Sequence, residues 1–453
     1  MATTYLTRTS TTPTSTKIGT FSVWFKRSKL DSEQNIFNAS LDTNDRGYIQ
    51  LDDGTDGIIR IWAEASGVSV LDLKTDRLFR DTSGWYHLVV AWDTSQSVAA
   101  NRVKMYINGV QETSFSTETY PTQDVTTMPW NISGYTVSLG SNFGGGGSFG
   151  NFYSGLMSYA AFIDGTQEAP AIFGETDSDT GEWKIKTTIT PSSAWGNNGF
   201  FILKDGNSVT DQSGESNNLT VAAGTLTNTE DCPDDVFCTL NPLDNKWAAS
   251  TFSNGNTTLL TISGNAAYNP STFAVRKGKF YFEVKIDADS VGNAQEDLMI
   301  GISNQSPTAS GTGGAIEAGD GFGIRGNGKM WAGSGETTGW PNIDVGDIVT
   351  IAVDFDNGYF YMGIDGVWGN SGDPTSGATG TGGYGFTVGD NDWFMGVNRR
   401  STSATSTFSV NFGNGYFGTT AISSAGTNAS DIGEFEFDVP TGYTALSTKG
   451  LNE

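Results

Sequence analysis

Few residues in this sequence could do bond-breaking chemistry. The single histidine, His87, would have to serve any Ser-His-Asp or Cys-His mechanism. With one histidine, the closely spaced Cys232 and Cys238 make no zinc ligand set. Gly144 to Gly147 is followed neither by Lys-Ser/Thr nor by a helix, so it is not a phosphate loop. We therefore expect no catalytic residues, no metal site and no resident cofactor.

Sugar recognition is a different kind of chemistry, because it needs aromatic faces and planar polar groups on loops. Such residues lie in or beside loops expected at 304–318, 327–343 and 368–385. Two interpretations stay open: a rim that binds a glycan or a partner, or packing inside the fold. Tryptophans in glycine-rich loops keep the first interpretation open. The candidate glycan- or partner-binding residues are Trp331, Trp340, Asn342, Trp368, Asn370, Tyr384, Asp390 and Trp393.

The elements that must position these loops are β-strands. Within Val345–Gly369, apolar residues alternate with smaller or polar ones from Val349 to Phe355, which is the period of a half-buried strand. A second strand, Phe360 to Ile364, ends at Asp365-Gly366. This pair suits a two-residue hairpin turn, in which both central residues have φ > 0.

The same pattern occurs earlier, in Gly84–Gln111. A strand over Tyr86–Trp92 and a polar loop precede a strand over Val103–Ile107, and Asn108-Gly109 turns the chain. The two hairpins predict the centres of two separate sandwiches. A length of 453 residues also suggests two or three domains, at roughly 100–200 residues each. Abundant glycine (59 residues), 12% aromatic residues and the lack of long apolar runs at helical spacing favour an all-β protein.

Charge and hydropathy limit the partners. The net charge of −25 repels phosphates and anionic lipids, so we expect neither nucleic acid nor membrane binding. No apolar stretch is long enough for a membrane span, and the N-terminus shows no secretory signal. We therefore expect synthesis in a cytoplasm and release by cell lysis. Without a signal, free thiols are expected at Cys232 and Cys238, and a bridge across their short loop is the alternative.

Several segments carry family resemblances. FSVWFKR, GWYHLVVAWD…VKMYINGV and YSGLMSYAAFIDG resemble, in order and spacing, the laminin-G and concanavalin-like lectin sandwich. DQSGESNN resembles a D-x-S-G-x-x-N segment of laminin-G-like modules. Further along, KFYFEVKI, LMIGIS, GDGFGI, VGDIVTIAVDFDNGYFYMGIDG and FSVNFG resemble the SPRY domain, a β-sandwich used for binding.

These resemblances imply an all-β fold with two antiparallel β-sandwich (jelly-roll, concanavalin-like) domains in tandem. We predict an extended N-terminal arm over residues 1–17 and a laminin-G/concanavalin-like sandwich with a peripheral extension over 18–231. A junction at 232–239 leads to a SPRY-like sandwich over 240–453.

The tandem order resembles structural proteins of marine tailed bacteriophages. NGFFILKD, DQSGESNN and FCTLNPLD precede the second module, and NFGNGYF…VPTGYTALST follows its core. The resemblance implies a virion component (tail fibre, spike or capsid fibre) with other virion proteins and a host-surface glycan or receptor as partners. Phage fibres are usually trimers, so a homo-oligomer is expected, although no heptad segment supports a coiled-coil stalk.

The concanavalin-like resemblance also raises two questions, namely whether the chain cleaves glycans and whether it binds calcium. Glucanases of this fold carry E-x-D-x-E on one strand, and no such triplet occurs here. The nearest carboxylates, Glu283…Asp287-Ala288-Asp289 and Glu434-Phe435-Glu436, are explained by an exposed polar strand face. Laminin-G-like modules often hold calcium on rim loops. Calcium ligands and ordinary Asx turns are alternative interpretations of the acidic zone formed by Asp42, Asn44, Asp45, Asp52, Asp53 and Asp56.

Three functions follow from the sequence. The favoured one is a non-enzymatic virion structural protein that binds a host-surface glycan. The second is a purely architectural decoration or connector protein. The third is a glycan-cleaving enzyme on the same fold, against which the missing carboxylate triplet argues.

Overall fold

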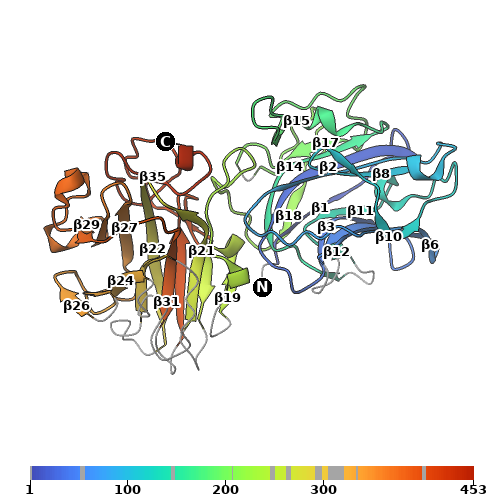
Figure 1. Cartoon of the computed structure of the whole chain (residues 1–453). Helices are drawn as coiled ribbons and strands as arrows, with labels where there is room; N and C mark the ends of the chain where they lie inside the picture. The colour runs from blue at the N-terminus through green and yellow to red at the C-terminus, as the bar shows by residue number, and fades with distance from the viewer. Residues whose placement is uncertain are drawn as a thin grey trace. The chain divides into compact units, whose positions relative to one another are not determined.

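The computed structural model describes residues 3–51, 57–143, 148–206, 208–244, 250–261, 267–290, 298–304, 321–332, 335–399 and 405–452. These residues form β-strands joined by turns and short 3-10 helices (Figure 1). The chain divides into two compact units, Met1–Asn228 and Thr229–Glu453. Each unit has a hydrophobic core of its own between antiparallel sheets. The predicted all-β class with two tandem sandwiches is confirmed.

Unit 1 packs an eight-stranded sheet against a six-stranded sheet. The eight-stranded sheet runs, in spatial order, β10 (Phe115–Thr119), β6 (Val68–Thr75), β5 (Ile59–Ala65), β4 (Arg46–Leu51), β3 (Gln34–Ser40), β11 (Thr136–Leu139), β1 (Tyr5–Thr9) and β18 (Thr220–Ala223). The six-stranded sheet runs β17 (Phe200–Ile202), β14 (Gly155–Asp164), β2 (Ile18–Arg27), β7 (Tyr86–Asp93), β8 (Val103–Ile107) and β9 (Val110–Glu112).

Smaller elements complete unit 1. They are the hairpins β12 (Asn142–Phe143) with β13 (Phe149–Gly150) and β15 (Gly174–Thr176) with β16 (Trp183–Ile185), and the 3-10 helices η1 (Ala99–Asn101), η2 (Pro129–Asn131) and η3 (Pro170–Ile172).

The alternation of side chains explains how the eight-stranded sheet is oriented. In β5, Ile59, Ile61 and Ala63 are buried in the core, whereas Arg60 and Trp62 between them are half-buried on the outer face. This is the period of two expected of a strand with one face in the core. The outer face of this sheet is therefore polar and aromatic.

The N-terminus differs from the predicted arm over residues 1–17. Residues Tyr5–Thr9 form strand β1, which pairs with β11 on one side and β18 on the other. Leu6, only 3% exposed, anchors the strand in the core. One inward apolar side chain among threonines is enough for a strand inside a sheet, because the backbone hydrogen bonds do not depend on side-chain type.

Unit 2 has a nine-stranded and a six-stranded sheet. The first runs β19 (Thr251–Ser253), β20 (Thr258–Leu260), β32 (Ser406–Asn411), β22 (Lys279–Asp289), β27 (Ile348–Asp354), β28 (Tyr359–Ile364) and β29 (Val367–Trp368), with β30 (Tyr384–Gly385) on β28 and β35 (Thr444–Ala445) on β22. The second runs β21 (Ala267–Val275), β31 (Trp393–Arg399), β23 (Leu298–Ser303), β24 (Gly321–Arg325), β25 (Lys329–Ala332) and β26 (Gly335–Thr338).

The remaining elements of unit 2 are short. They are the hairpin β33 (Tyr416–Phe417) with β34 (Thr420–Ala421), and the 3-10 helices η4 (Pro242–Asp244), η5 (Asn254–Asn256), η7 (Gly369–Ser371), η8 (Pro374–Thr379) and η9 (Gly450–Asn452). Both cysteines are free thiols, and Cys238 is buried in the core of this unit. Within the part of the chain that is described, no helix is long and apolar enough to cross a bilayer.

Both Asx-Gly hairpin turns predicted from the sequence are present. Asn108 and Gly109 have φ of 49° and 78°, and Asp365 and Gly366 have φ of 49° and 77°. Two consecutive positive φ values are those of a type I′ turn. The turns join β8 to β9 in unit 1 and β28 to β29 in unit 2.

Candidate functional site

His87 lies in β7 and is 1% exposed. The indole N–H of Trp183 donates to His87 Nδ1 at 3.0 Å, so Nδ1 is an acceptor and the ring proton sits on Nε2. Nε2 then donates to Ser22 Oγ at 2.9 Å. A histidine that activates a serine needs the opposite tautomer. Burial also lowers the pKa of His87 to about 3, so the ring is a neutral packing group.

The carboxylates nearest to a glucanase pattern hold the fold of unit 2 together. Glu283 is fully buried and accepts hydrogen bonds from Tyr281 OH (3.0 Å), Asn411 Nδ2 (3.1 Å) and the backbone N–H groups of Glu436 (3.0 Å) and Phe437 (2.9 Å). Burial raises the pKa of Glu283 to about 7, and the four donors oppose that rise. This carboxylate ties a late segment of the chain to β22 and is fully buried, which corrects the exposed polar strand face expected from the sequence.

Glu434 of that pattern is exposed, and the three remaining members have fixed partners. Asp289 pairs with Arg399 at 2.9 Å and accepts from Ser406 Oγ at 2.7 Å. Asp287 accepts from Ser409 Oγ at 2.6 Å, and Glu436 accepts from the backbone N–H of Ser423 at 2.6 Å. Each of these three carboxylates is used by a neighbouring strand or turn.

The acidic zone considered for calcium is an Asx turn where the structure describes it. Asp42 Oδ1 accepts from the backbone N–H of Asn44 at 2.8 Å and of Asp45 at 3.0 Å. Asp45 Oδ1 accepts from the Ser66 N–H at 2.9 Å. Asp52, Asp53 and Asp56 lie outside the described residues. Among those that are described, no three His, Cys, Asp or Glu side chains are placed to hold a metal ion.

The predicted rim of unit 2 comes together only in part. Trp340 and Asn342 lie in one segment that contacts the segment of Trp368 and Asn370. The Asn370 N–H donates to Gly339 O at 3.0 Å, and a Cβ built on Gly369 would lie 3.1 Å from Trp340 Cδ1. Asn342 and Asn370 are exposed, and the two indoles are half-buried. These four residues form one polar and aromatic corner.

The other predicted residues lie elsewhere. Trp393 is 5% exposed, donates to Val388 O at 2.9 Å and is a core residue. Tyr384 is half-buried, with its ring 5.2 Å from that of Phe322. Trp331, in β25, is half-buried under the Arg325 guanidinium, which lies 4.2 Å from the indole centroid. Asp390 is exposed. The packing interpretation thus describes Trp393 fully. Trp331, Trp340, Trp368 and Tyr384 also pack against hydrophobic clusters with part of their surface exposed, and the corner of Trp340 and Trp368 stays a candidate.

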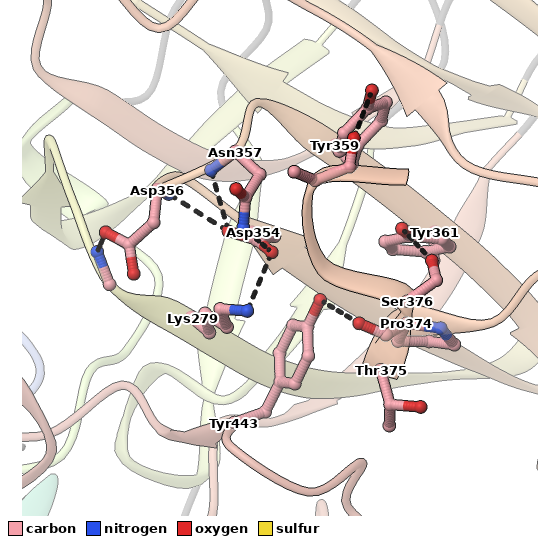
Figure 2. A network of polar contacts seen from close by, with 12 residues as sticks. Lys279, Asp354, Asp356, Asn357, Tyr359, Tyr361, Pro374, Thr375, Ser376 and Tyr443 are labelled. Carbon is pink, nitrogen blue, oxygen red and sulfur yellow. Dashed lines mark hydrogen bonds and ion pairs between the residues drawn. The ribbon is translucent and has the colours of Figure 1, made fainter. Parts of the chain in front are cut away.

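Three tyrosines hold the third predicted loop, residues 368–385, against the sheet (Figure 2). Tyr443 OH donates to Pro374 O at 3.1 Å, and Tyr359 OH donates to Ala378 O at 3.3 Å. The Tyr361 hydroxyl lies 3.4 Å from Ser376 Oγ. Because η8 is fixed at these points, the loop presents a preorganised surface rather than one that must order on binding.

An ion pair with a buried carboxylate holds the turn that follows β27. Lys279 Nζ lies 2.9 Å from Asp354 Oδ2, and Asp354 also accepts from the backbone N–H groups of Asp356 and Asn357 (Figure 2). The Asp354 side chain is fully buried, and its partners are the Lys279 ammonium group and backbone N–H donors. The pair therefore fixes the turn between β27 and β28. The Asp354 carboxylate is engaged in these contacts and is not placed as a catalytic acid.

A groove of about 580 Å³ on the outer face of the eight-stranded sheet of unit 1 was not expected from the sequence. It is formed by β1, β11 and β18, the 216–218 segment and the β12–β13 hairpin. Its lining residues are Thr7, Arg8, Thr9, Thr136, Phe149, Ser216, Asn217, Asn218, Thr220 and Ala222. We call it the polar groove.

The DQSGESNN segment builds one wall of the polar groove. Asp211 accepts from the backbone N–H groups of Phe201, Ser213 and Asn217 at 2.8 to 2.9 Å, which closes the segment onto the sheet. Arg8 donates to Asn217 Oδ1 at 2.5 Å and to Asn198 O at 3.1 Å. Burial lowers the pKa of Arg8, and the negative charges of Asp211 and Asp164 oppose that change.

The opposite wall is aromatic. Phe149 of β13 stacks on Tyr5 of β1, with ring centroids 4.5 Å apart. Hydroxyls, amides, one guanidinium and one aromatic ring thus converge on a space of the size of small-ligand sites, about 300–1,000 Å³. None of the lining residues given above is a carboxylate or a histidine. The polar groove can bind a hydroxylated ligand, but its lining supplies no acid–base pair.

Comparison with known family models finds a match within unit 1. A family model described as the Concanavalin A-like lectin/glucanases superfamily matches residues 2–173. These residues include β1, β11 and β13 of the polar groove. The laminin-G/concanavalin-like resemblance drawn from the sequence is supported there. No curated protein matches the chain.

Solved structures are matched at low similarity. The SPRY domain of human HERC1 is 17% identical with a TM-score of 0.31, covering 38% of this chain and 96% of that one. A heptameric SAP-like pentraxin from Limulus polyphemus is 18% identical with a TM-score of 0.27, covering 37% and 71%. The Ruminococcus gnavus sialidase CBM40 bound to α2,3 sialyllactose is 12% identical with a TM-score of 0.25, covering 34% and 78%. These likenesses carry no conclusion about function.

Proposed function

We propose that this chain is a non-enzymatic structural protein of a virus particle that binds a host-surface glycan through the polar groove. The observation that carries the proposal is the groove itself. It gathers hydroxyl, amide and guanidinium groups beside an aromatic ring, in about 580 Å³, on the outer face of a lectin-like sheet. Those are the groups that hydrogen-bond sugar hydroxyls and pack on the apolar faces of sugar rings.

Binding without cleavage is supported by the placement of the titratable groups. Glycosidic hydrolysis needs two carboxyl groups on either side of the scissile bond, roughly 5–10 Å apart. The carboxylates nearest to such a pattern, Glu283, Asp287 and Asp289, are held by fold contacts, and the lining of the polar groove has none. His87 is buried in the tautomer that cannot activate Ser22.

The place in a virion is supported by the sequence segments that resemble structural proteins of tailed bacteriophages. A tail fibre, spike or capsid fibre has other virion proteins as neighbours and usually forms a homo-oligomer, of which a trimer is the usual fibre form. The ordered corner around Trp340 and Trp368 is the proposed second recognition surface, for a receptor or a virion neighbour. Labelling of intact particles with an antibody against this chain, followed by electron microscopy, tests the location, and a signal absent from particles contradicts it.

Glycan binding is tested with the full chain on a glycan array, followed by titration calorimetry with the best ligand. Thr9→Val removes one groove hydroxyl at nearly constant volume, and Phe149→Ala removes the ring. We expect both to weaken binding, Phe149→Ala by about tenfold or more. Thr176→Val, at an exposed threonine of β15 on the other side of the unit, is the matched control and leaves affinity unchanged. No binding by the wild type, or equal binding by all variants, contradicts the proposal.

A further inference from the structure

A second cluster on the same sheet combines aromatic rings with paired charges. Tyr48 of β4 and Trp62 of β5 are direct cross-strand neighbours whose rings stack with centroids 5.0 Å apart. The Arg46 guanidinium lies 5.3 Å from the indole centroid, and that of Arg60 lies 6.0 Å from the Tyr48 ring. With Glu64 and Asp72, these residues are called the aromatic platform.

Each arginine of the platform is matched by a carboxylate. Arg60 makes two parallel hydrogen bonds to Asp72, from Nε and Nη2, both at 2.9 Å. Arg46 Nε lies 3.6 Å from Glu64 Oε2. All four charged side chains keep between 16% and 27% of their surface exposed. Planar polar groups are thus held in fixed orientations at the solvent edge of two aromatic rings, and they cancel each other's charge.

The platform and the polar groove share one face of one sheet. Direct strand pairing runs from Thr9 to Thr136, Ser40, Arg46 and Glu64, across five adjacent strands. Directly opposed residues of neighbouring strands point to the same side. At about 4.8 Å per strand, the row extends about 19 Å from the groove to the platform. Ser40, in the middle of the row, is fully buried and donates to Phe143 O of β12 at 3.3 Å, so a ligand that reaches both clusters crosses β12. The length suits an oligosaccharide of several units rather than a single sugar.

A buried amide, that of Asn38, lies between the two clusters. The neighbouring row of direct pairs runs from Thr7 through Ser138 and Asn38 to Tyr48 and Trp62. Asn38 is fully buried, and neither atom of its amide has a hydrogen-bond partner among the described residues. Buried polar side chains are nearly always hydrogen-bonded. The buried amide is therefore a place for an internal water molecule.

We propose that the aromatic platform is a second subsite of the glycan-binding face and that it selects uncharged sugar units. This rests on the proposed glycan-binding function. Trp62, the more exposed of the two rings, offers apolar contact to the C–H face of a sugar, and the guanidinium and carboxylate pairs bond to neighbouring hydroxyls. Because each guanidinium is already neutralised, an acidic sugar gains no new ion pair there. The net charge of −25 further repels sialylated and uronate-rich chains.

The test uses the full chain and titration calorimetry with neutral oligosaccharides of one, two and four or more units, and with sialylated or uronate chains of matched length. For the wild type, affinity rises with chain length and neutral chains bind better than acidic ones. Trp62→Ala lowers the affinity for the long neutral chain by about tenfold and leaves that for the shortest ligand unchanged. Trp195→Ala, a half-buried indole stacked on Phe201 of the other sheet, is the matched control.

A second variant keeps the ring and tests the charge argument. Asp72→Asn leaves Arg60 without its carboxylate, so the preference for neutral over acidic chains falls by several-fold. If Trp62→Ala behaves like Trp195→Ala while Phe149→Ala abolishes binding, then the polar groove binds the glycan and the aromatic platform is not a subsite. A wild-type preference for acidic chains, or an Asp72→Asn variant with unchanged selectivity, overturns the proposed specificity. If no oligosaccharide binds the wild type, both proposals are wrong.

Discussion

The two Asx-Gly hairpins, β8–β9 in unit 1 and β28–β29 in unit 2, have the same turn but different buried anchors. In both, a later segment places an aromatic ring on the turn glycine. A Cβ on Gly109 would lie 2.4 Å from Trp183 Cε3, and one on Gly366 would lie 2.8 Å from Phe437 Cδ1. The covering segment is then bound to the sheet by a buried polar group: Trp183 by neutral His87, and the backbone of Phe437 by Glu283.

This difference shows that one sandwich design can carry opposite pH responses. The neutral imidazole of His87 and the carboxyl group of Glu283 each bind the segment that covers the turn. The imidazole resists gaining a proton when the protein is folded, whereas the buried carboxyl resists losing one. The stability of the two units should therefore change in opposite directions as the pH falls from neutrality.

The largest expected effect is acid destabilisation of unit 1 through His87. Its pKa falls from 6.5 in the unfolded chain to about 3 in the folded one. Below about pH 6.5 the unfolded chain takes up a proton that the folded unit refuses, so stability is lost as the pH falls toward 3. The full effect is about 5 kcal/mol, and about 2–3 kcal/mol appears by pH 4.5. Calorimetric unfolding of His87→Gln, which cannot titrate, should lose this pH dependence, and an unchanged slope contradicts the assignment.

The next effect has the opposite sign and belongs to unit 2. The pKa of Glu283 rises from 4.5 in the unfolded chain to about 7 in the folded one. The folded unit therefore holds the proton more tightly, and the contribution is present below about pH 4.5 and lost as the pH rises through 7. Its size is about 3 kcal/mol. Glu283→Gln should remove that fall between pH 5 and 8 in calorimetry or urea unfolding. A variant whose unfolding free energy still falls as steeply would show that another group is responsible.

Two glycine substitutions compare the turns themselves. Both positions have positive φ, and the added methyl group meets a wide indole at Gly109 but a smaller phenyl ring at Gly366. We expect Gly109→Ala to lower the unfolding free energy by about 3 kcal/mol and Gly366→Ala by about 2 kcal/mol. Urea titration measures both. Equal costs would mean that the two covering rings move aside with the same ease. Reversed costs would mean that the phenyl ring over Gly366 yields less readily than the indole over Gly109.

The smallest effect is expected at the residue after each turn. Val110 is 68% exposed and Val367 is 73% exposed. Val110→Thr and Val367→Thr should each change the unfolding free energy by less than about 0.5 kcal/mol, because neither side chain packs in the core. A larger change in thermal unfolding at only one of them would show that its hairpin tip has a neighbour that the other lacks.

Strand positions were predictable from the sequence where the apolar pattern was regular. The strand expected at Val349–Phe355 is β27 (Ile348–Asp354), and that expected at Tyr86–Trp92 is β7 (Tyr86–Asp93). The Asx-Gly turns were predictable because few other residues accept two consecutive positive φ values. Strand β1 was not, since a threonine-rich segment with one inward leucine has no strong hydrophobic period.

The candidate site was harder to predict for a topological reason. The polar groove joins residues near positions 7, 136, 149 and 217, which only strand pairing brings together. The tryptophans of unit 2 show the same limit. Trp393 and Trp368 look alike as loop-adjacent residues, but the first begins a core strand and the second lies at the end of a hairpin. Residue type indicated recognition chemistry, and tertiary contacts decided which residues could take part.

A crystal structure of the full chain, soaked with a neutral oligosaccharide that it binds, would show directly whether the outer face of the eight-stranded sheet binds glycan without cleaving it. We expect an intact oligosaccharide across that face, with one sugar unit against Phe149 and Thr9 and another against Trp62. A ligand seated elsewhere, or a cleaved product in the groove, would contradict this expectation.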